Sequence, residues 1–139
     1  MAKSEIFIRV PCTVHRVPRK KSAMFDFEKL DVYQVIKAQS TKVLIFLQKK
    51  NAIDPYLADQ WKRASLSIFL NLAEGTGRMT DADKIHFLTI ARGSVYECTA
   101  IIDLLKSTKQ IDDEFFTELY ATYEQMSKML LGMYRSYSK

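Results

Sequence analysis

Two stretches of the chain place polar groups beside apolar positions that a simple helical bundle has no need to interrupt. One holds Asn71 and Glu74, and the other holds Arg92 next to the glycine Gly93. A buried charge without a partner is costly, so these groups need specific contacts. Glu74 and Arg92 carry opposite charges on consecutive predicted helices, and we therefore expect them to pair. The expected arrangement is an interhelix polar network of Asn71, Glu74, Arg92 and Ser94.

Catalysis is the other chemistry that such groups can perform, but the rest of the sequence does not support it. A catalytic carboxylate at Glu74 needs a second acid or a base nearby. The histidines are His15 and His86. The cysteines are Cys12 and Cys98. None of these residues has the spacing of a metal site or of a nucleophile and its base. We therefore predict no catalytic residue, no metal and no cofactor, in a protein that is not an enzyme.

The composition is that of one ordinary globular domain. Of the 139 residues, 47% are hydrophobic and 27% are charged, while four are glycine and three are proline. So few turn-forming residues argue against a β-sandwich or a barrel. No apolar run approaches the roughly 18 residues of a membrane span, and the N-terminus lacks the pattern of a secretory signal. We expect a cytoplasmic protein without a membrane partner.

The formal net charge of +5 is concentrated at the N-terminus. Residues 1–24 carry six basic side chains and one acidic one, whereas residues 25–139 carry 15 of each kind. The first segment contains prolines and shows no helical period, which predicts a flexible basic tail. Met24 directly precedes the first helical pattern, so translation starting there would make the tail non-native. Both interpretations stay open.

Apolar residues at spacings of three and four predict four long helices. The predicted segments are about 27–50, 55–74, 80–106 and 112–137. Asp26, Asp54 and Thr80 stand where helix N-caps are needed. Long helices joined by short loops indicate an all-α, up-down-up-down antiparallel four-helix bundle over residues 25–139.

Two glycines need an explanation within this scheme. Gly75 is expected to take the left-handed position just past the end of the second helix. Gly93 lies inside the third helix, where a glycine costs roughly 1 kcal/mol relative to alanine. We expect a close approach of the second helix to be the reason for Gly93.

The polar motifs of the second and third helices resemble a known family. Residues 62–78 read KRASLSIFLNLAEGTGR, residues 87–97 read FLTIARGSVYE, and residues 27–33 read FEKLDVY. This pattern is similar to that of the intervening-sequence protein of bacterial large-subunit ribosomal RNA genes, a family also called S23. The resemblance covers about residues 25–137. One departure is Phe69-Leu70, where the family usually carries Pro-Ser, and it makes the second helix continuous and more apolar.

The resemblance implies a four-helix protomer that assembles into a ring-like homopentamer. One branch of the family is the accessory protein of diversity-generating retroelements, which binds a reverse transcriptase and its template RNA. Other members bind RNA or have no assigned role. The implied partners are other copies of the chain, structured RNA and, in the most specific version, a reverse transcriptase.

Basic residues near the helix ends are the candidate nucleic-acid contacts: Lys49, Lys50, Lys62, Arg63, Arg78 and Lys84. Each one taken alone is more simply explained as solvated, salt-bridged surface. A ring would repeat them around its axis and could form a phosphate-binding surface from neutral protomers. Exposed tyrosines such as Tyr33, Tyr56 or Tyr96 could add base stacking. The competing hypothesis is a protein-only adaptor with no nucleic-acid role.

The fourth predicted helix has an apolar sector that is wider than one packing seam requires. Its members are Phe115, Phe116, Tyr120, Tyr123, Met126, Met129, Leu130, Met133, Tyr134 and Tyr137. Such a sector is compatible with a subunit interface and equally compatible with a bulky core inside one protomer.

Overall fold

The structure, a computed structural model, describes residues 25–49 and 53–139. In this part of the chain a short 3₁₀-helix is followed by four long α-helices, and no strand is formed. The elements are η2 (Asp26–Lys29), α3 (Asp31–Gln48), α4 (Pro55–Thr76), α5 (Asp81–Ser107) and α6 (Asp113–Tyr137). The predicted all-α class is confirmed. The predicted tail, residues 1–24, lies outside the described residues.

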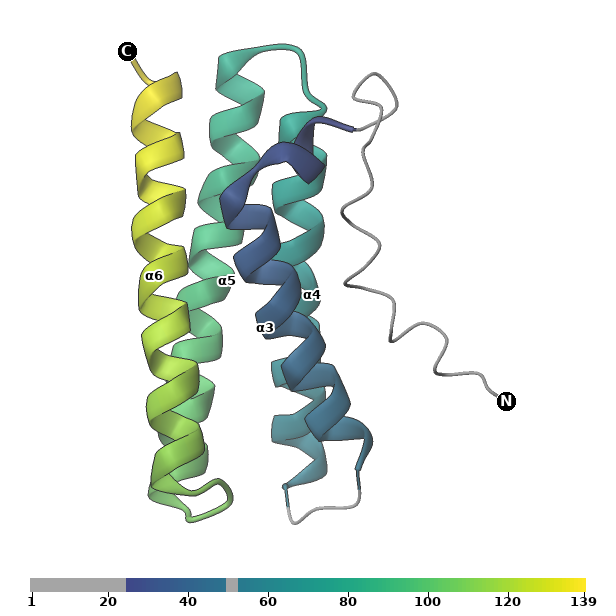
Figure 1. Cartoon of the computed structure of the whole chain (residues 1–139), viewed down its shortest axis with the longest axis vertical. Coiled ribbons are helices and arrows are strands. Elements are labelled where there is room, and N and C mark those ends of the chain that lie inside the picture. Colours follow the sequence, from purple (N-terminus) through teal and green to yellow (C-terminus); the bar gives the residue numbers. More distant parts are fainter. Residues whose placement is uncertain (1–24, 50–52) are drawn as a thin grey trace, which may run out of the picture.

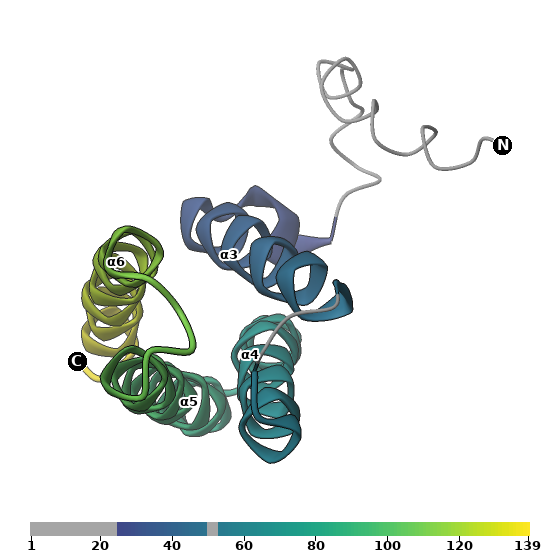
Figure 2. The same cartoon turned by 90° about the horizontal axis from the view of Figure 1, so that it is seen from below.

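The four α-helices form an up-down-up-down bundle (Figure 1). The end view in Figure 2 shows them in the order α3, α4, α5, α6 around the bundle. Each helix contacts the next one in the chain, and α3 also contacts α6. The end of α3, the start of α4 and the loop from α5 to α6 lie at one end of the bundle, whereas the loop from α4 to α5 lies at the other end with the C-terminus.

Three helices begin with side-chain caps, of which Asp54 and Thr80 were predicted from the sequence and Asp112 was not. Asp54 accepts a hydrogen bond from the Leu57 backbone N–H at 3.0 Å, and Pro55 follows it at the first helical position. Thr80 caps α5 in the same way, accepting from the Asp83 N–H at 3.1 Å. Asp112 caps α6 with a bond of 2.8 Å from the N–H of residue 115. These bonds satisfy donors that the first turn of a helix otherwise leaves unpaired.

The first long helix starts later than predicted. The structure places a 3₁₀ turn at residues 26–29 and an extended residue, Leu30, before α3 begins at Asp31. Asp26 is therefore not the N-cap of α3, whose cap residue Leu30 makes no side-chain bond. The break lets the Phe27 ring pack on Tyr33, with ring centroids 4.9 Å apart. Aromatic packing thus replaces the expected first turn of helix.

The core follows the predicted seams of all four helices. Its largest fully buried side chains are Trp61, Tyr123, Ile36, Ile68, Leu72, Ile102, Leu105, Leu119, Met126, Leu130, Val43 and Val95. The Trp61 indole N–H donates to the Tyr123 hydroxyl at 3.0 Å, which satisfies both polar atoms inside the apolar interior. Ser65 Oγ lies 3.8 Å from the Cys98 thiol sulfur beside them. Most of the core is apolar, and the buried polar side chains of Gln39, Ser65 and Ser94 each contact a polar or sulfur atom of a neighbouring helix.

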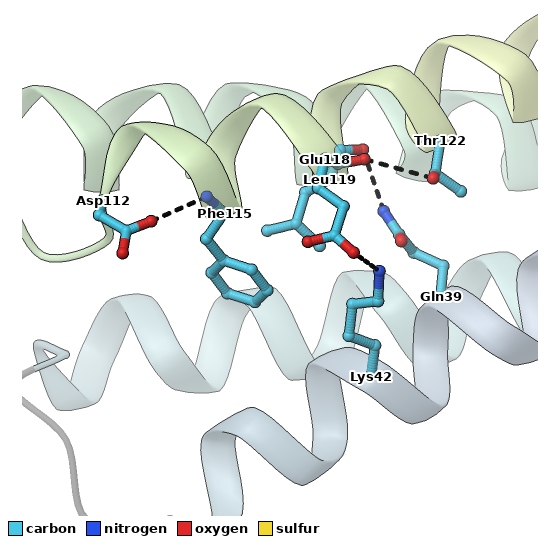
Figure 3. A network of polar contacts seen from close by, with 7 residues as sticks. All are labelled: Gln39, Lys42, Asp112, Phe115, Glu118, Leu119 and Thr122. Carbon is cyan, nitrogen blue, oxygen red and sulfur yellow. Dashed lines mark hydrogen bonds and ion pairs between the residues drawn. The ribbon is translucent and has the colours of Figure 1, made fainter.

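Gln39 interrupts the apolar face of α3 because its amide has a partner on α6. The side-chain nitrogen donates to the main-chain oxygen of Leu119 at 3.1 Å, and Gln39 is only 3% exposed (Figure 3). One turn further along, Lys42 pairs with Glu118 at 2.7 Å. A buried amide bonded to a main-chain oxygen fixes the register of α3 against α6.

The two glycines have roles other than those predicted. Gly75 is buried within α4, whose C-cap is Gly77, and no glycine of the described chain has a positive φ. A Cβ at position 75 would lie 3.0 Å from the Phe87 Cβ, so Gly75 allows α5 to approach α4 closely. A Cβ at Gly93 would have nothing within 4 Å. The predicted close approach is therefore wrong for Gly93 and occurs at Gly75.

The wide apolar sector of α6 is used mostly within the protomer. Tyr123, Met126 and Leu130 are buried, and five other members of the sector are partly buried against the core. Tyr120 and Tyr134 are the exposed members, at 45% and 38%. The bulky-core explanation thus accounts for most of this sector, and two tyrosines remain at the surface.

Candidate nucleic-acid interface

The predicted pair of Glu74 and Arg92 does not form within the protomer. Glu74 instead pairs with Arg78 one turn further along α4, at 2.5 Å. None of the ion pairs among the described residues includes Arg92. The prediction failed because both side chains have suitable partners elsewhere, and opposite charge on neighbouring helices does not itself fix a pair.

Arg92 instead joins α5 to α6. Its Nε donates to the main-chain oxygen of Ser127 at 3.1 Å, and its Nη2 donates to the Tyr96 hydroxyl at 3.2 Å. The guanidinium carbon also lies over the Tyr96 ring, 5.1 Å from its centroid. Two hydrogen bonds and a cation–π contact hold the half-buried guanidinium in place without a carboxylate.

The other two members of the predicted network are connected, but through a residue that the prediction did not include. Ser94 on α5 donates to the Ser67 hydroxyl on α4 at 2.8 Å. The Asn71 side-chain amide donates to the Ser67 main-chain oxygen at 2.8 Å and to its hydroxyl at 3.1 Å. Ser67 is therefore the centre of the interhelix network, and Glu74 and Arg92 lie outside it.

The six candidate nucleic-acid contacts do not form one patch on the protomer. Lys49 follows α3 at one end of the bundle, whereas Arg78 lies in the α4–α5 loop and Lys84 lies near the start of α5, both at the opposite end. Lys62 and Arg63 lie between them on the outer part of α4. Lys50 falls outside the described residues. A surface that combines these charges would require more than one copy of the chain or an elongated ligand.

Several of these cations already have partners inside the protomer. Arg63 pairs with Asp59 at 2.8 Å, and Arg78 pairs with Glu74. The Lys84 ammonium donates to the Arg78 main-chain oxygen at 2.7 Å and lies over the Tyr137 ring. Lys84 also donates to a carbonyl of the last turn of α4, so it neutralises the negative end of that helix.

Lys62 is the candidate with the most available charge, because it is exposed and forms no ion pair among the described residues. The tyrosines predicted to stack on bases also differ in their exposure to solvent. Tyr33 is buried at 8% exposure, which removes it from consideration, whereas Tyr56 and Tyr96 are 70% and 58% exposed. Lys62, Tyr56 and Tyr96 thus have the accessibility that an RNA contact needs.

A groove between α5 and α6 is the feature that the sequence did not reveal. It has a volume of about 550 Å³ and is lined by Leu88, Thr89, Arg92, Gly93, Tyr96, Leu130, Leu131 and Tyr134. The spacing of Arg92 and Tyr96, four residues apart beside the seam of α5, was the available signal. Their location on a groove could not be predicted, because it depends on how α6 packs.

The structure offers no evident catalytic chemistry in the part that it describes. No group of three or more potential metal ligands occurs among the described residues. Burial raises the pKa of the Cys98 thiol to about 11, which keeps it protonated and unreactive at neutral pH. None of the described helices combines the length and apolar character that crossing a membrane requires.

The structure is that of a small all-α four-helix bundle. Its unusual polar residues, among them Ser67, Asn71, Arg92 and Ser94, lie on two consecutive helices, α4 and α5. The model of the 23S rRNA-intervening sequence protein family matches residues 28–132. The chain therefore belongs to that family, and the match includes both polar motifs and nearly all of the bundle.

A similar fold occurs in the crystal structure of a protein with unknown function from the S23 ribosomal protein family of Bacteroides thetaiotaomicron. The two chains share 21% sequence identity and superpose with a TM-score of 0.67, over 75% of this chain and 95% of the other. At this level of identity the likeness concerns the fold alone. No curated protein matches the chain.

Proposed function

We infer that the protein is a non-enzymatic, self-associating subunit that binds structured RNA or a ribonucleoprotein. The observation that carries this proposal is membership of a family named for a protein of 23S rRNA intervening sequences, matched over residues 28–132. Accessible Lys62, Tyr56 and Tyr96 supply the cation and the aromatic faces that RNA binding uses. The most specific version is an accessory subunit of a retroelement reverse transcriptase.

Exposed aliphatic side chains on the outside of the bundle support self-association. Leu66 and Leu70 lie one turn apart on α4 and are 38% and 57% exposed. On α5, Ile90 and Leu104 are also exposed. The adjacent Leu66 and Leu70 form an exposed apolar pair that favours a protein contact, and a pentamer is the assembly that we propose. Repeating Lys62, Arg78 and Lys84 in a ring would join charges that lie apart in one protomer.

RNA binding by residues 24–139, compared with binding by the whole chain, tests this function. The shorter protein lacks the +5 charge of the first 23 residues, so its affinity reports on the bundle alone. We expect the shorter protein to retain binding to a structured RNA. Replacing Lys62 with Gln should weaken that binding, whereas Lys128→Gln, which removes a charge already paired with Glu124, should change it less.

The second candidate function is a protein-only adaptor, favoured by the same exposed aliphatic residues on α4 and α5. An oligomer of residues 24–139 that binds no RNA would support the adaptor. It would also assign any RNA affinity of the whole chain to the basic N-terminal segment.

A further inference from the structure

We propose that the groove between α5 and α6 is a nucleotide subsite for single-stranded RNA, with the phosphate on Arg92 and the base against Tyr134. This inference rests on the proposed function, because it names the place where the bundle holds an unpaired nucleotide. The groove volume of about 550 Å³ falls within the range of small-molecule sites. Its walls are mostly apolar, and Arg92 contributes a positive charge.

Arg92 is prepared for an anion. The guanidinium has five N–H donors, and its hydrogen bonds to Ser127 and Tyr96 use two of them. No carboxylate pairs with it in the described chain. Glu124, in an adjoining hollow that shares Tyr96, pairs with Lys128 at 3.6 Å. A phosphate would meet a positioned cation whose remaining donors form a planar fork.

Tyr134 provides the surface for a base. It lines the groove, is 38% exposed, and its side chain forms no hydrogen bond or ring contact with the described residues. Tyr96 lines the groove from the other helix, α5, and one side of its ring is already covered by the Arg92 guanidinium. An exposed ring beside a positioned guanidinium suits a nucleotide better than an apolar peptide, because bases stack on both kinds of group.

Gly93 gives the groove its width. A Cβ at this position would have nothing within 4 Å, so no contact inside the protomer explains a glycine in the middle of α5. Two further cations lie near the groove along the chain and would offer contacts to neighbouring phosphates. Lys84 lies one helical turn before the groove residue Leu88, and Arg135 adjoins Tyr134 on α6.

Substituting Gly93 tests the site, because a larger side chain fills the groove without an evident clash. Gly93→Leu should leave the fold intact, since the position is open and leucine is a good helix former. Gly132→Leu is the matched control, because Gly132 is also helical and open but does not line the groove. The probe is a ten-nucleotide uridine RNA containing one 4-thiouridine, bound to the whole chain.

The readouts are affinity by fluorescence anisotropy, photo-crosslinked residues by mass spectrometry, and oligomeric mass. We expect crosslinks at Tyr134 or Tyr96, an affinity lowered about 5- to 100-fold by Gly93→Leu, and no change with Gly132→Leu. Arg92→Gln should reduce the salt slope by about 0.7, the value for one phosphate of a single strand.

Crosslinks confined to other residues, with affinity unaffected by Gly93→Leu, would overturn the subsite and leave the proposed function standing. A loss of oligomeric mass in Gly93→Leu, without any groove crosslink in the parent protein, would identify the groove as a subunit contact and also overturn it. Failure of the parent protein to bind any RNA, structured or single-stranded, would overturn both proposals.

Discussion

The Arg92 guanidinium donates from Nε to the main-chain oxygen of Ser127, 3.1 Å away, and thereby joins the middle of α5 to the middle of α6. The same side chain reaches the Tyr96 hydroxyl one turn along its own helix. Arg92 therefore has a structural and a surface role together. It holds two helices in register, and it presents a positive charge at the rim of an apolar groove.

A double-mutant cycle should separate Arg92 from Glu74 energetically. Arg92→Met removes a charged hydrogen bond and should lower the free energy of unfolding by about 1–2 kcal/mol. Glu74→Gln breaks an exposed pair within one helix and should change it by less than about 0.5 kcal/mol. Their interaction energy, measured by urea unfolding at fixed protein concentration, should be below about 0.5 kcal/mol. A coupling above about 1 kcal/mol would show that the two side chains do pair.

Alanine at the two helical glycines should have opposite effects. Gly93→Ala should raise the free energy of unfolding by about 0.5–1 kcal/mol, because the site is open and alanine is the better helix former. Gly75→Ala should lower it by about 1–3 kcal/mol, because the new methyl meets the Phe87 Cβ at 3.0 Å. Thermal unfolding of both variants measures the difference. Equal effects of the same sign would contradict the assignment of close packing to Gly75.

Gln39 should tolerate loss of its amide better than gain of a charge. Gln39→Met should change the free energy of unfolding by less than about 1 kcal/mol, because an apolar side chain of similar size fills the site. Gln39→Glu should cost about 2–4 kcal/mol at pH 7, because it buries a carboxylate facing the Leu119 carbonyl.

The cost of Gln39→Glu should also depend on pH. Burial raises the pKa of such a carboxyl, so its penalty grows as the pH rises and shrinks as the pH falls toward 5. Urea midpoints at pH 5 and pH 7 measure this change. A penalty that does not vary with pH would contradict the buried placement of residue 39.

Cys98 should make the protein less stable in alkali. Burial raises the pKa of the thiol from 9.0 to about 11. The contribution of the protonated thiol to the free energy of unfolding is therefore complete below about pH 9 and is lost as the pH rises toward 11. The loss should approach about 2–3 kcal/mol. Burial also raises the pKa of Tyr123, which adds a loss of the same sign above about pH 10. Urea midpoints of the parent protein and of Cys98→Ala, measured between pH 8 and 10.5, separate the effect of the thiol from that of Tyr123. If the midpoints of the two proteins fall with pH in parallel, the burial of Cys98 is contradicted.

The helices were predictable because their signals are local. Capping residues such as Asp54 and Thr80, and apolar residues at spacings of three and four, act within a few turns of the same helix. The network at Ser67 and the bond from Arg92 to Ser127 were not predictable, because they depend on the rotation of one helix against another. The start of α3 was misplaced because the contact of Phe27 with Tyr33 competes with helical continuity.

The candidate interface was predicted only as a set of residue types. Lysines and arginines near helix ends could be identified, but not whether each one has a partner inside the protomer. Lys84 illustrates this, since its ammonium binds main-chain oxygens at the end of α4. The groove beside Gly93 requires knowledge of α6 as well as of α5, and a sequence pattern within one helix does not provide it.

Salt dependence of RNA binding by residues 24–139, with oligomeric mass determined on the same sample, tests the central claim most directly. We predict a pentamer that binds structured RNA. The logarithm of its binding constant should fall linearly with the logarithm of the salt concentration, by about 0.9 for each phosphate contacted, and several phosphates should be contacted. A pentamer that shows no RNA binding, or binding that does not vary with salt, would contradict the proposed RNA-binding role.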